Sequence, residues 1–392
     1  MALKILVSAG EASGDLYLSR LVETLQIRHC EAEFFGCAGP RMQTAGVRAV
    51  VDAKSLAVVG LVEVIAHLPR IHGEFRKLLA SADKHKPDLA ILCDSPDFNL
   101  RVARQLKKRG IPVVYLVAPQ VWAWRENRVR AFPGLIDVLL CIFPFEQSWF
   151  RLRGVNATYI GHPLTRIVKP RGGVELPADF VAILPGSRPG EVGRHLPALL
   201  ETVAILRSRN PNLDFVLALP EGFTARSEPN FSERIRAASI QVIEGATWDV
   251  LAQAKVALAA SGTVTMEAAM LGTPMVTFYR VNAVSWFLGS RLVRVPHVTM
   301  VNLVAGGDVL PEAGSSRVVT EWIQGQMTPE NLAGEVDRLL HDEPARNAMR
   351  AELVKLTDRL RGEQDPMEKA ANEIEKLLDK KLSRRDFENV SS

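Results

Sequence analysis

Apolar and polar positions along the chain alternate between two periods, one typical of buried strands and one typical of helices. Amphipathic segments of helix length cover residues 17–29, 100–109 and 196–209. The short apolar runs that predict strands are KILVS (4–8), LAILC (89–93), VVYLV (113–117), VLLCIF (138–143), FVAIL (180–184), DFVLAL (214–219), KVALAA (255–260) and PMVTFY (274–279). This alternation predicts an α/β fold with parallel sheets and helices on both faces.

The same pattern starts twice along the chain. Proline and glycine concentrate at 162–178, and the segment FVAILPGSR that follows resembles the opening KILVSAGE. We therefore expect two Rossmann-like, doubly wound domains, 1–165 and 166–350, which face each other across a cleft. The last segment, 351–392, is rich in Arg, Lys and Glu with spaced Leu and Ala, so it predicts helices that pack back toward the first domain.

Composition places the chain among ordinary globular proteins. Its 392 residues are 47% hydrophobic and 23% charged. No window approaches the ~18 apolar residues of a membrane helix, and the apolar run before Ser8 is too short for a signal peptide, so we expect a cytoplasmic location. The cysteines are far apart without a CxxC spacing, which predicts core residues and neither zinc ligands nor disulfides: Cys30, Cys37, Cys93 and Cys141.

Charge is uneven between the two halves. Residues 1–165 carry 21 Lys and Arg against 15 Asp and Glu, whereas residues 166–392 carry 27 against 29. A basic first half suits an anionic partner such as phosphate, nucleic acid or an anionic membrane surface. An ordinary solvated surface explains the small excess equally well.

Two predicted strands of the first half end in acidic turns. After LAILC, Asp94 and Asp97 flank Ser95 and Pro96, which is typical of a plain turn and also of a ligand site at a strand end. The first turn, SAGEASGD (8–15), offers glycines and a helix start, but it matches neither GxGxxG nor the Walker pattern. Its Glu11 would repel phosphate, which favours contact with the hydroxyls of a sugar.

Two turns of the second half suit phosphates. In LPGSRPGEVGRH (184–195), Arg188 can grip phosphate oxygens with its planar fork, although an ion pair with Glu191 is about as plausible. In AASGTVTMEAA (259–269), the hydroxyls and N–H groups of residues 261–263 suit a diphosphate at a helix start. Glu267 then lies in an apolar helix, where a buried carboxylate needs hydrogen-bond donors. The hydroxyls of a ribose would supply them, and we prefer this to a buried ion pair.

Two long apolar stretches have no polar motif of their own. Residues 56–68 (LAVVGLVEVIAHL) and 283–293 (AVSWFLGSRLV) are by default core helices. Basic residues close to both stretches would also suit a surface that meets lipid.

Together these motifs resemble one family, the lipid-A-disaccharide synthases, which are glycosyltransferases of the GT-B architecture. The similar segments are SAGEASGD (8–15), DSPDFN (94–99), APQVWAWRENRV (118–129), FPFE (143–146), GHPL (161–164), LPGSRPGEV (184–192) and SGTVTMEAAMLGTPMV (261–276). They span most of the chain in the family's order. Departures are Cys93 before Asp94, residues 299–302 in place of Leu-Pro-Asn, and the stretch 314–326.

The resemblance implies a reaction and its partners. A UDP-linked 2,3-diacylglucosamine would give its sugar, with inversion, to the 6′-hydroxyl of 2,3-diacylglucosamine 1-phosphate, leaving a β-1,6 disaccharide and UDP. The enzyme would work at the cytoplasmic face of the inner membrane of a Gram-negative cell, with the first domain on the acceptor and membrane side and the second on the donor side. It implies no cofactor, no metal and no nucleic acid, and it leaves an oligomer open.

The resemblance also assigns roles to residues. Asp97 matches the PDFN position and would be the base that takes the proton of the attacking hydroxyl, with Asp94 orienting it and Glu11 as a third acid. The residues expected to bind substrate are Ser13, Gly14, Asn99, Gln120, Trp122, Arg125, Asn302 and Glu312. The residues expected to bind UDP are Gly186, Ser187, Arg188, Ser261, Gly262, Thr263 and Glu267.

Two other functions fit part of this pattern. Another GT-B enzyme acting on a UDP-hexosamine, such as an epimerase, would share the SGT…E element but neither PQVWAWR nor PDFN. A degenerate transferase would hold a nucleotide sugar without turning it over, and only the presence of Asp97, Arg188 and Glu267 argues against it.

Overall fold

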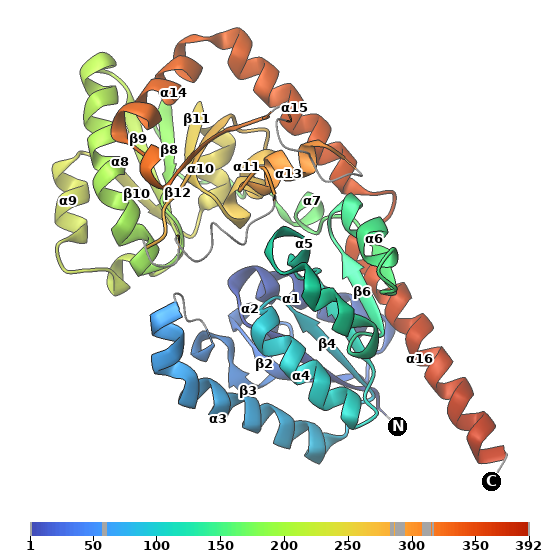
Figure 1. Cartoon of the computed structure of the whole chain (residues 1–392). Coiled ribbons are helices and arrows are strands. Elements are labelled where there is room, and N and C mark those ends of the chain that lie inside the picture. The colour runs from blue at the N-terminus through green and yellow to red at the C-terminus, as the bar shows by residue number, and fades with distance from the viewer. Residues whose placement is uncertain are drawn as a thin grey trace. The chain divides into compact units, whose positions relative to one another are not determined.

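The fold consists of two compact units, residues 1–163 with 361–392 and residues 164–360 (Figure 1). The computed structural model describes residues 2–56, 61–282, 286, 295–307, 315 and 317–390, without the side chains of 61–67 and 382–390. The apolar stretch 283–293 lies outside these residues except for Trp286, and so do the side chains of 57–67 in the stretch 56–68. No helix among the described residues combines the length and the apolar character needed to cross a membrane.

Unit 1 contains a seven-stranded parallel sheet in the order β3-β2-β1-β4-β5-β6-β7. Its strands are β1 (Lys4–Ala9), β2 (Glu33–Ala38), β3 (Arg48–Asp52), β4 (Leu89–Cys93), β5 (Val113–Leu116), β6 (Val138–Cys141) and β7 (Ala157–Tyr159). Its helices are α1 (Ala12–Arg28), α2 (Pro40–Thr44), η1 (Ala53–Ser55), α3 (Leu61–His85), α4 (Pro96–Lys108), α5 (Val121–Trp124), η2 (Glu126–Gly134), α6 (Pro144–Arg151) and α16 (Pro366–Val390). Every residue of β4 is buried, as an apolar run covered on both faces requires.

Unit 2 contains a six-stranded parallel sheet in the order β10-β9-β8-β11-β12-β13. Its strands are β8 (Phe180–Leu184), β9 (Asp214–Leu219), β10 (Gln241–Glu244), β11 (Val256–Ala260), β12 (Met275–Tyr279) and β13 (Thr320–Ile323). Its helices are α7 (Leu164–Ile167), α8 (Pro189–Arg209), η3 (Thr224–Arg226), α9 (Phe231–Ala237), α10 (Thr247–Gln253), α11 (Thr263–Met270), α13 (Met300–Ala305), η4 (Gln324–Gln326), α14 (Pro329–His341) and α15 (Glu343–Arg361). The prediction of two Rossmann-like halves is confirmed.

The predicted C-terminal segment 351–392 is divided between the units. Most of α15 belongs to unit 2, where Thr357 Oγ1 donates to Ala269 O over 3.1 Å. Helix α16 belongs to unit 1 and buries Ala370, Ala371 and Ile374 completely. The break expected at residue 350 therefore falls inside α15, and the units separate at 360/361 and at 163/164.

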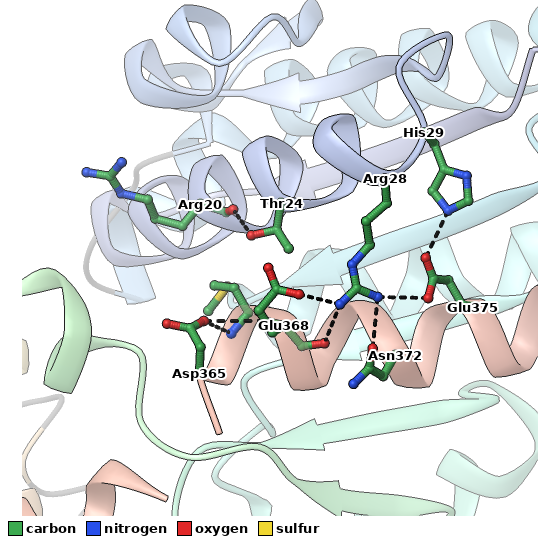
Figure 2. Close-up of polar contacts among 9 residues, drawn as sticks. Arg20, Thr24, Arg28, His29, Asp365, Glu368, Asn372 and Glu375 are labelled. Carbon is green, nitrogen blue, oxygen red and sulfur yellow. Dashed lines mark hydrogen bonds and ion pairs between the residues drawn. The ribbon is translucent and has the colours of Figure 1, made fainter. Parts of the chain in front are cut away.

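Arg28 connects α1 to α16 through several polar contacts (Figure 2). Arg28 Nη1 donates to Glu375 Oε2 over 2.7 Å and to Asn372 Oδ1 over 2.8 Å, and the guanidinium also forms an ion pair with Glu368. The hydrogen bond that Arg28 donates to Glu368 and the charge of Glu375 raise the pKa of Arg28. Planar, multidentate binding of carboxylates fixes the orientation of the two helices as well as their contact.

The cysteines fit the expectation with one exception. Cys37, Cys93 and Cys141 are buried on strands, whereas Cys30 is exposed. The exposed thiol follows from its place after the end of α1, beyond the last buried turn.

Candidate active site

In both units the acidic or hydroxyl-bearing turns lie where the strand order of the sheet reverses. In unit 1, β1 and β4 are neighbours, and Ala9 is in register with Cys93, so the turns after both strands start side by side. In unit 2, β8 and β11 are neighbours, and Leu184 is in register with Ala259. Such switch points at the carboxyl ends of strands are the usual ligand sites of open α/β sheets.

Asp94 ties the two turns of unit 1 together. Its Oδ1 accepts from Gly10 N over 2.8 Å, and its Oδ2 accepts from Glu11 N over 3.1 Å. Asp94 and Ser95 both have positive φ, 51° and 38°, a conformation rare outside glycine. The strand therefore ends in a strained turn that points the Asp94 carboxylate back at the start of α1.

Two residues of these motifs brace that turn. A Cβ on Gly14 would lie 1.7 Å from Asp94 Oδ2, so only glycine allows this approach, and neighbouring Ser13 is half-buried. Asn99 is fully buried and accepts from Ser8 Oγ over 2.7 Å while donating to Cys93 O over 2.8 Å. Gly14 and Asn99 thus shape the turn from within.

The environment of Asp94 makes its carboxyl a weak acid. Burial raises its pKa to about 8, and the negative charge of the Glu11 side chain adds to this rise. The hydrogen bonds donated by the backbone of Gly10 and Glu11 and by the side chain of Ser95 act in the opposite direction and lower the pKa. Glu11 itself is exposed. The Asp94 carboxyl is turned into the protein and bonded to the start of α1, so we give it an orienting role.

This pKa predicts how stability depends on pH. The folded pKa of Asp94 is raised, so between about pH 4 and pH 8 the folded chain holds a proton that the unfolded chain releases. Asp94 therefore destabilises the fold increasingly as pH rises through this window. We expect Asp94→Asn, which cannot titrate, to gain in free energy of unfolding relative to the native sequence between about pH 5 and pH 8 in urea denaturation. A difference that stays constant with pH would contradict the raised pKa.

Asp97 is the second acid of this strand end, and its surroundings differ. It lies in the first turn of α4 with its side chain 60% exposed. Its Oδ1 accepts from Arg125 Nη1 over 3.4 Å and forms a close ion pair with Arg128. Asp97 is thus a charged carboxylate at the surface, whereas Asp94 is turned inward.

The PQVWAWR segment has one buried and one exposed tryptophan. Trp122 is buried, and its Nε1 donates to Glu146 Oε1 over 3.2 Å. Burial raises the pKa of Glu146 to about 8. The guanidinium of Arg125 stacks on Trp124, 4.1 Å from the ring centroid. Gln120, at the start of α5, is exposed, and so is Trp124. The exposed surface of this segment therefore combines polar side chains with one indole ring.

The turn after β8 is built around a glycine and a glutamate. Gly186 has a φ of 120°, and a Cβ there would lie 2.5 Å from Glu191 Oε2. That same oxygen accepts from Ser187 N over 3.3 Å, which satisfies one N–H of the turn. Arg188 is the residue before α8 and is half-buried, so its guanidinium starts at the mouth of the turn.

The turn after β11 exposes backbone and hydroxyls at the start of α11. Gly262 and Thr263 are exposed, and Ser261 Oγ donates to Val298 O over 3.5 Å. One turn further, Glu267 is half-buried, and its Oε2 accepts from Trp248 Nε1 over 3.0 Å. The indole fixes one carboxylate oxygen of Glu267 in place.

Two residues expected to bind substrate lie in or next to the segments that depart from the family's pattern, Asn302 within 299–302 and Glu312 before 314–326. Asn302 is buried, donates to Val319 O and Glu321 Oε1, and accepts from the N–H groups of Val318 and Val319. Its side-chain amide is fully used in holding this loop, so we give it a structural role. Glu312 lies outside the described residues.

Several contacts of these sites were not anticipated from the sequence. They are made by Arg128 to Asp97, by Trp248 to Glu267 and by Glu191 to Ser187. Arg128 and Glu191 are part of the motifs quoted above. The contact of Arg128 with Asp97 and that of Trp248 with Glu267, however, join residues that are far apart in sequence. Among the described residues, no group of three His, Cys, Asp or Glu side chains is close enough to hold a metal ion.

Comparison with known proteins identifies the family. Residues 5–374 match the sequence model of the family described as lipid-A-disaccharide synthetase. The chain is 52% identical to the lipid-A-disaccharide synthase of Solibacter usitatus over 96% of this chain and 98% of that one. It is 39% identical to the enzyme of the same name from Koribacter versatilis over 97% and 100%.

Solved structures with the same architecture are more distant in sequence. The S. aureus MnaA–UDP co-structure has a TM-score of 0.64 at 14% identity and covers 96% of this chain and 97% of that one. The spinosyn rhamnosyltransferase SpnG complexed with thymidine diphosphate has a TM-score of 0.56 at 16% identity, over 95% and 99%. These similarities show the GT-B fold. On the family match and the identities to named relatives, the chain belongs to the lipid-A-disaccharide synthetase family of glycosyltransferases, which build the lipid A disaccharide from a nucleotide-sugar donor and a lipid acceptor.

Proposed function

We propose that the chain transfers 2,3-diacylglucosamine from UDP to the 6′-hydroxyl of 2,3-diacylglucosamine 1-phosphate with inversion, forming the β-1,6 disaccharide 1-phosphate and UDP. The observation that carries this proposal is the family match over residues 5–374 together with the two switch-point sites. The finer choice of substrates rests on the resemblance of the motifs.

Unit 1 supplies the acceptor side of the proposed reaction. We assign the base to Asp97, an exposed carboxylate at the strand end that contacts Arg125 and Arg128 and would take the proton of the attacking hydroxyl. Asp94, with its raised pKa and its bonds to Gly10 and Glu11, holds the turn from which α4 and Asp97 start. Single-step displacement by the deprotonated hydroxyl inverts the configuration at the anomeric carbon of the donor sugar.

Unit 2 supplies the donor side. The exposed N–H groups and hydroxyls at the start of α11, and Arg188 before α8, suit the diphosphate. We assign Glu267, whose Oε2 accepts from Trp248 Nε1, to the ribose hydroxyls. Negative charge that develops on the leaving UDP is thus stabilised by helix ends and an arginine, with no step that needs a metal.

Both proposed substrates carry acyl chains, so we propose that the enzyme works peripherally at the cytoplasmic face of the inner membrane. The excess of basic residues in 1–165 suits an anionic surface.

Release of UDP tests the proposed function. We expect the purified protein to release UDP from UDP-2,3-diacylglucosamine only when 2,3-diacylglucosamine 1-phosphate is present, measured with a coupled UDP assay in detergent. Equal release without the acceptor would indicate hydrolysis. Conversion of a UDP-hexosamine without release would indicate an epimerase, and binding without release would indicate a non-catalytic protein.

A further inference from the structure

An arginine-rich cavity in unit 1 is not explained by any role assigned so far. It has a volume of about 280 Å³ and lies between α4 and η2 (α4 is labelled in Figure 1). Arg101 and Arg104 line it from α4, and Arg128 and Arg130 line it from η2. One carboxylate, Asp97, is also part of its wall.

The charges of this cavity are not balanced within unit 1. Arg128 is paired with Asp97. The guanidinium groups of Arg101, Arg104 and Arg130 form no hydrogen bond or ion pair with any residue that the structure describes. Three unpaired guanidiniums around one cavity favour an anion of more than one charge, and a phosphate monoester carries about −1.5 to −2 at neutral pH.

Apart from Asn127, the rest of the lining is apolar. Phe132 and Leu135 are buried and contribute to the wall, as does Leu100. An apolar wall with a few convergent charges is typical of a site for a small organic molecule and less so of a site for a bare ion. The cavity therefore suits a phosphate that is attached to a larger, partly apolar body.

Asp97 and two of the arginines are arranged along one face of α4. Positions 97, 101 and 104 follow the i, i+4, i+7 spacing of a single helix face. At about 1.5 Å per residue, Arg104 lies about 10 Å along the helix from Asp97. In a hexose 1-phosphate, the carbons that carry the hydroxymethyl group and the phosphate both flank the ring oxygen, so the 6-hydroxyl and the 1-phosphate lie at the same edge of the ring and can both face this side of α4.

We propose that this cavity binds the 1-phosphate of the acceptor sugar, with Arg101, Arg104 and Arg130 holding the phosphate while the acceptor's attacking 6-hydroxyl lies at Asp97. The proposal rests on the proposed function, because it names the site for one group of that acceptor. Arg128 also has two possible partners in this proposal, because a bound phosphate competes with Asp97 for its guanidinium. The carboxylate of Asp97 is then released from its ion pair when the acceptor is in place.

The test compares two acceptors and three proteins. The acceptors are 2,3-diacylglucosamine 1-phosphate and the same molecule without phosphate, both in detergent micelles. The proteins are the native sequence, the double variant Arg101→Ala/Arg104→Ala, and Lys108→Ala as the control. Lys108 is exposed on the same helix and does not line the cavity, so its removal changes charge without touching the site.

We expect the native protein to prefer the phosphorylated acceptor by about tenfold or more in KM, the ratio that a charge-assisted bond provides. The double variant should lose this preference, with a small change in KM for the acceptor without phosphate, and Lys108→Ala should keep it. A double variant that retains the native preference would overturn the proposal. If the double variant keeps the preference and also no longer sediments with anionic vesicles, the arginines contact lipid headgroups instead of the acceptor phosphate.

A binding measurement separates this proposal from the proposed function. Calorimetric titration with glucosamine 1-phosphate, and with glucosamine as the control, needs no turnover. Phosphate-dependent binding that disappears in the double variant supports the cavity even if the native protein releases no UDP, an outcome that would count only against the proposed function. Binding equal for the native protein and the double variant would refute the site.

Discussion

An Asp97→Asn variant is expected to lose about 10²- to 10⁴-fold in kcat, the usual contribution of a general base. Asparagine has nearly the same size and can still accept from Arg125 and Arg128, but it cannot take a proton at neutral pH. UDP affinity should change little, because the UDP contacts are assigned to unit 2. The measurement is kcat with both lipid substrates together with calorimetric titration of UDP.

Two variants make that result specific. Asp83→Asn is the matched control, because Asp83 is also an exposed aspartate bound by an arginine, Arg109, and it lies on α3 away from the switch point. It should keep native turnover. Asp94→Asn should cost less than Asp97→Asn, since Asp94 orients the turn. If Asp97→Asn turns over normally while Asp94→Asn or Glu11→Gln does not, the base has been assigned to the wrong acid.

A Glu267→Ala variant is expected to bind UDP more weakly by a factor of about ten or more, because hydrogen bonds to a charged group contribute about 1.5–3 kcal/mol each. The carboxylate is oriented by Trp248 Nε1 at 3.0 Å, and the proposed contact with UDP adds the hydroxyls of the ribose. Calorimetric titration of UDP measures the effect, and circular dichroism checks that the variant is folded.

Trp248→Phe is the matched control for this experiment. It removes the indole donor but keeps the acid, so UDP affinity should fall less than in Glu267→Ala. Unchanged affinity in a folded Glu267→Ala variant would give Glu267 a purely structural role. A larger loss in Trp248→Phe than in Glu267→Ala would indicate that the ring itself contacts the nucleotide.

The strands that the sequence predicted are those buried on both faces. In LAILC, all five residues of β4 are buried, and a run of that kind is plain in any window. Five strands were not predicted: β2, β3, β7, β10 and β13. Four of these, β3, β7, β10 and β13, are the edges of the two sheets and are short, partly exposed or charged. The fifth, β2 (EFFGCA), is buried apart from Glu33, but Gly36 interrupts its apolar run. Helices α4 and α8 begin at Pro96 and Pro189, earlier than their apolar periodicity suggested, since proline is favoured in the first turn.

The candidate sites were predicted in position but not in their contacts. Polar residues directly after buried strands identified both switch points, because parallel strands end at a common edge. The separate environments of Asp94 and Asp97 depend on backbone N–H groups of another turn and on arginines of η2, which sequence spacing cannot place. For the same reason the burial of Trp122 and the saturated amide of Asn302 were not foreseen.

The central claim is the identity of the product, and one measurement tests it most directly. The protein is incubated with UDP-2,3-diacylglucosamine and 2,3-diacylglucosamine 1-phosphate, and the lipid product is analysed by mass spectrometry and by NMR of its anomeric proton. The account predicts a disaccharide with two diacylglucosamine units, one phosphate and a β-1,6 linkage. An α-linked disaccharide would contradict inversion, and a free sugar or an epimerised UDP-sugar in place of the disaccharide would contradict the proposed transfer itself.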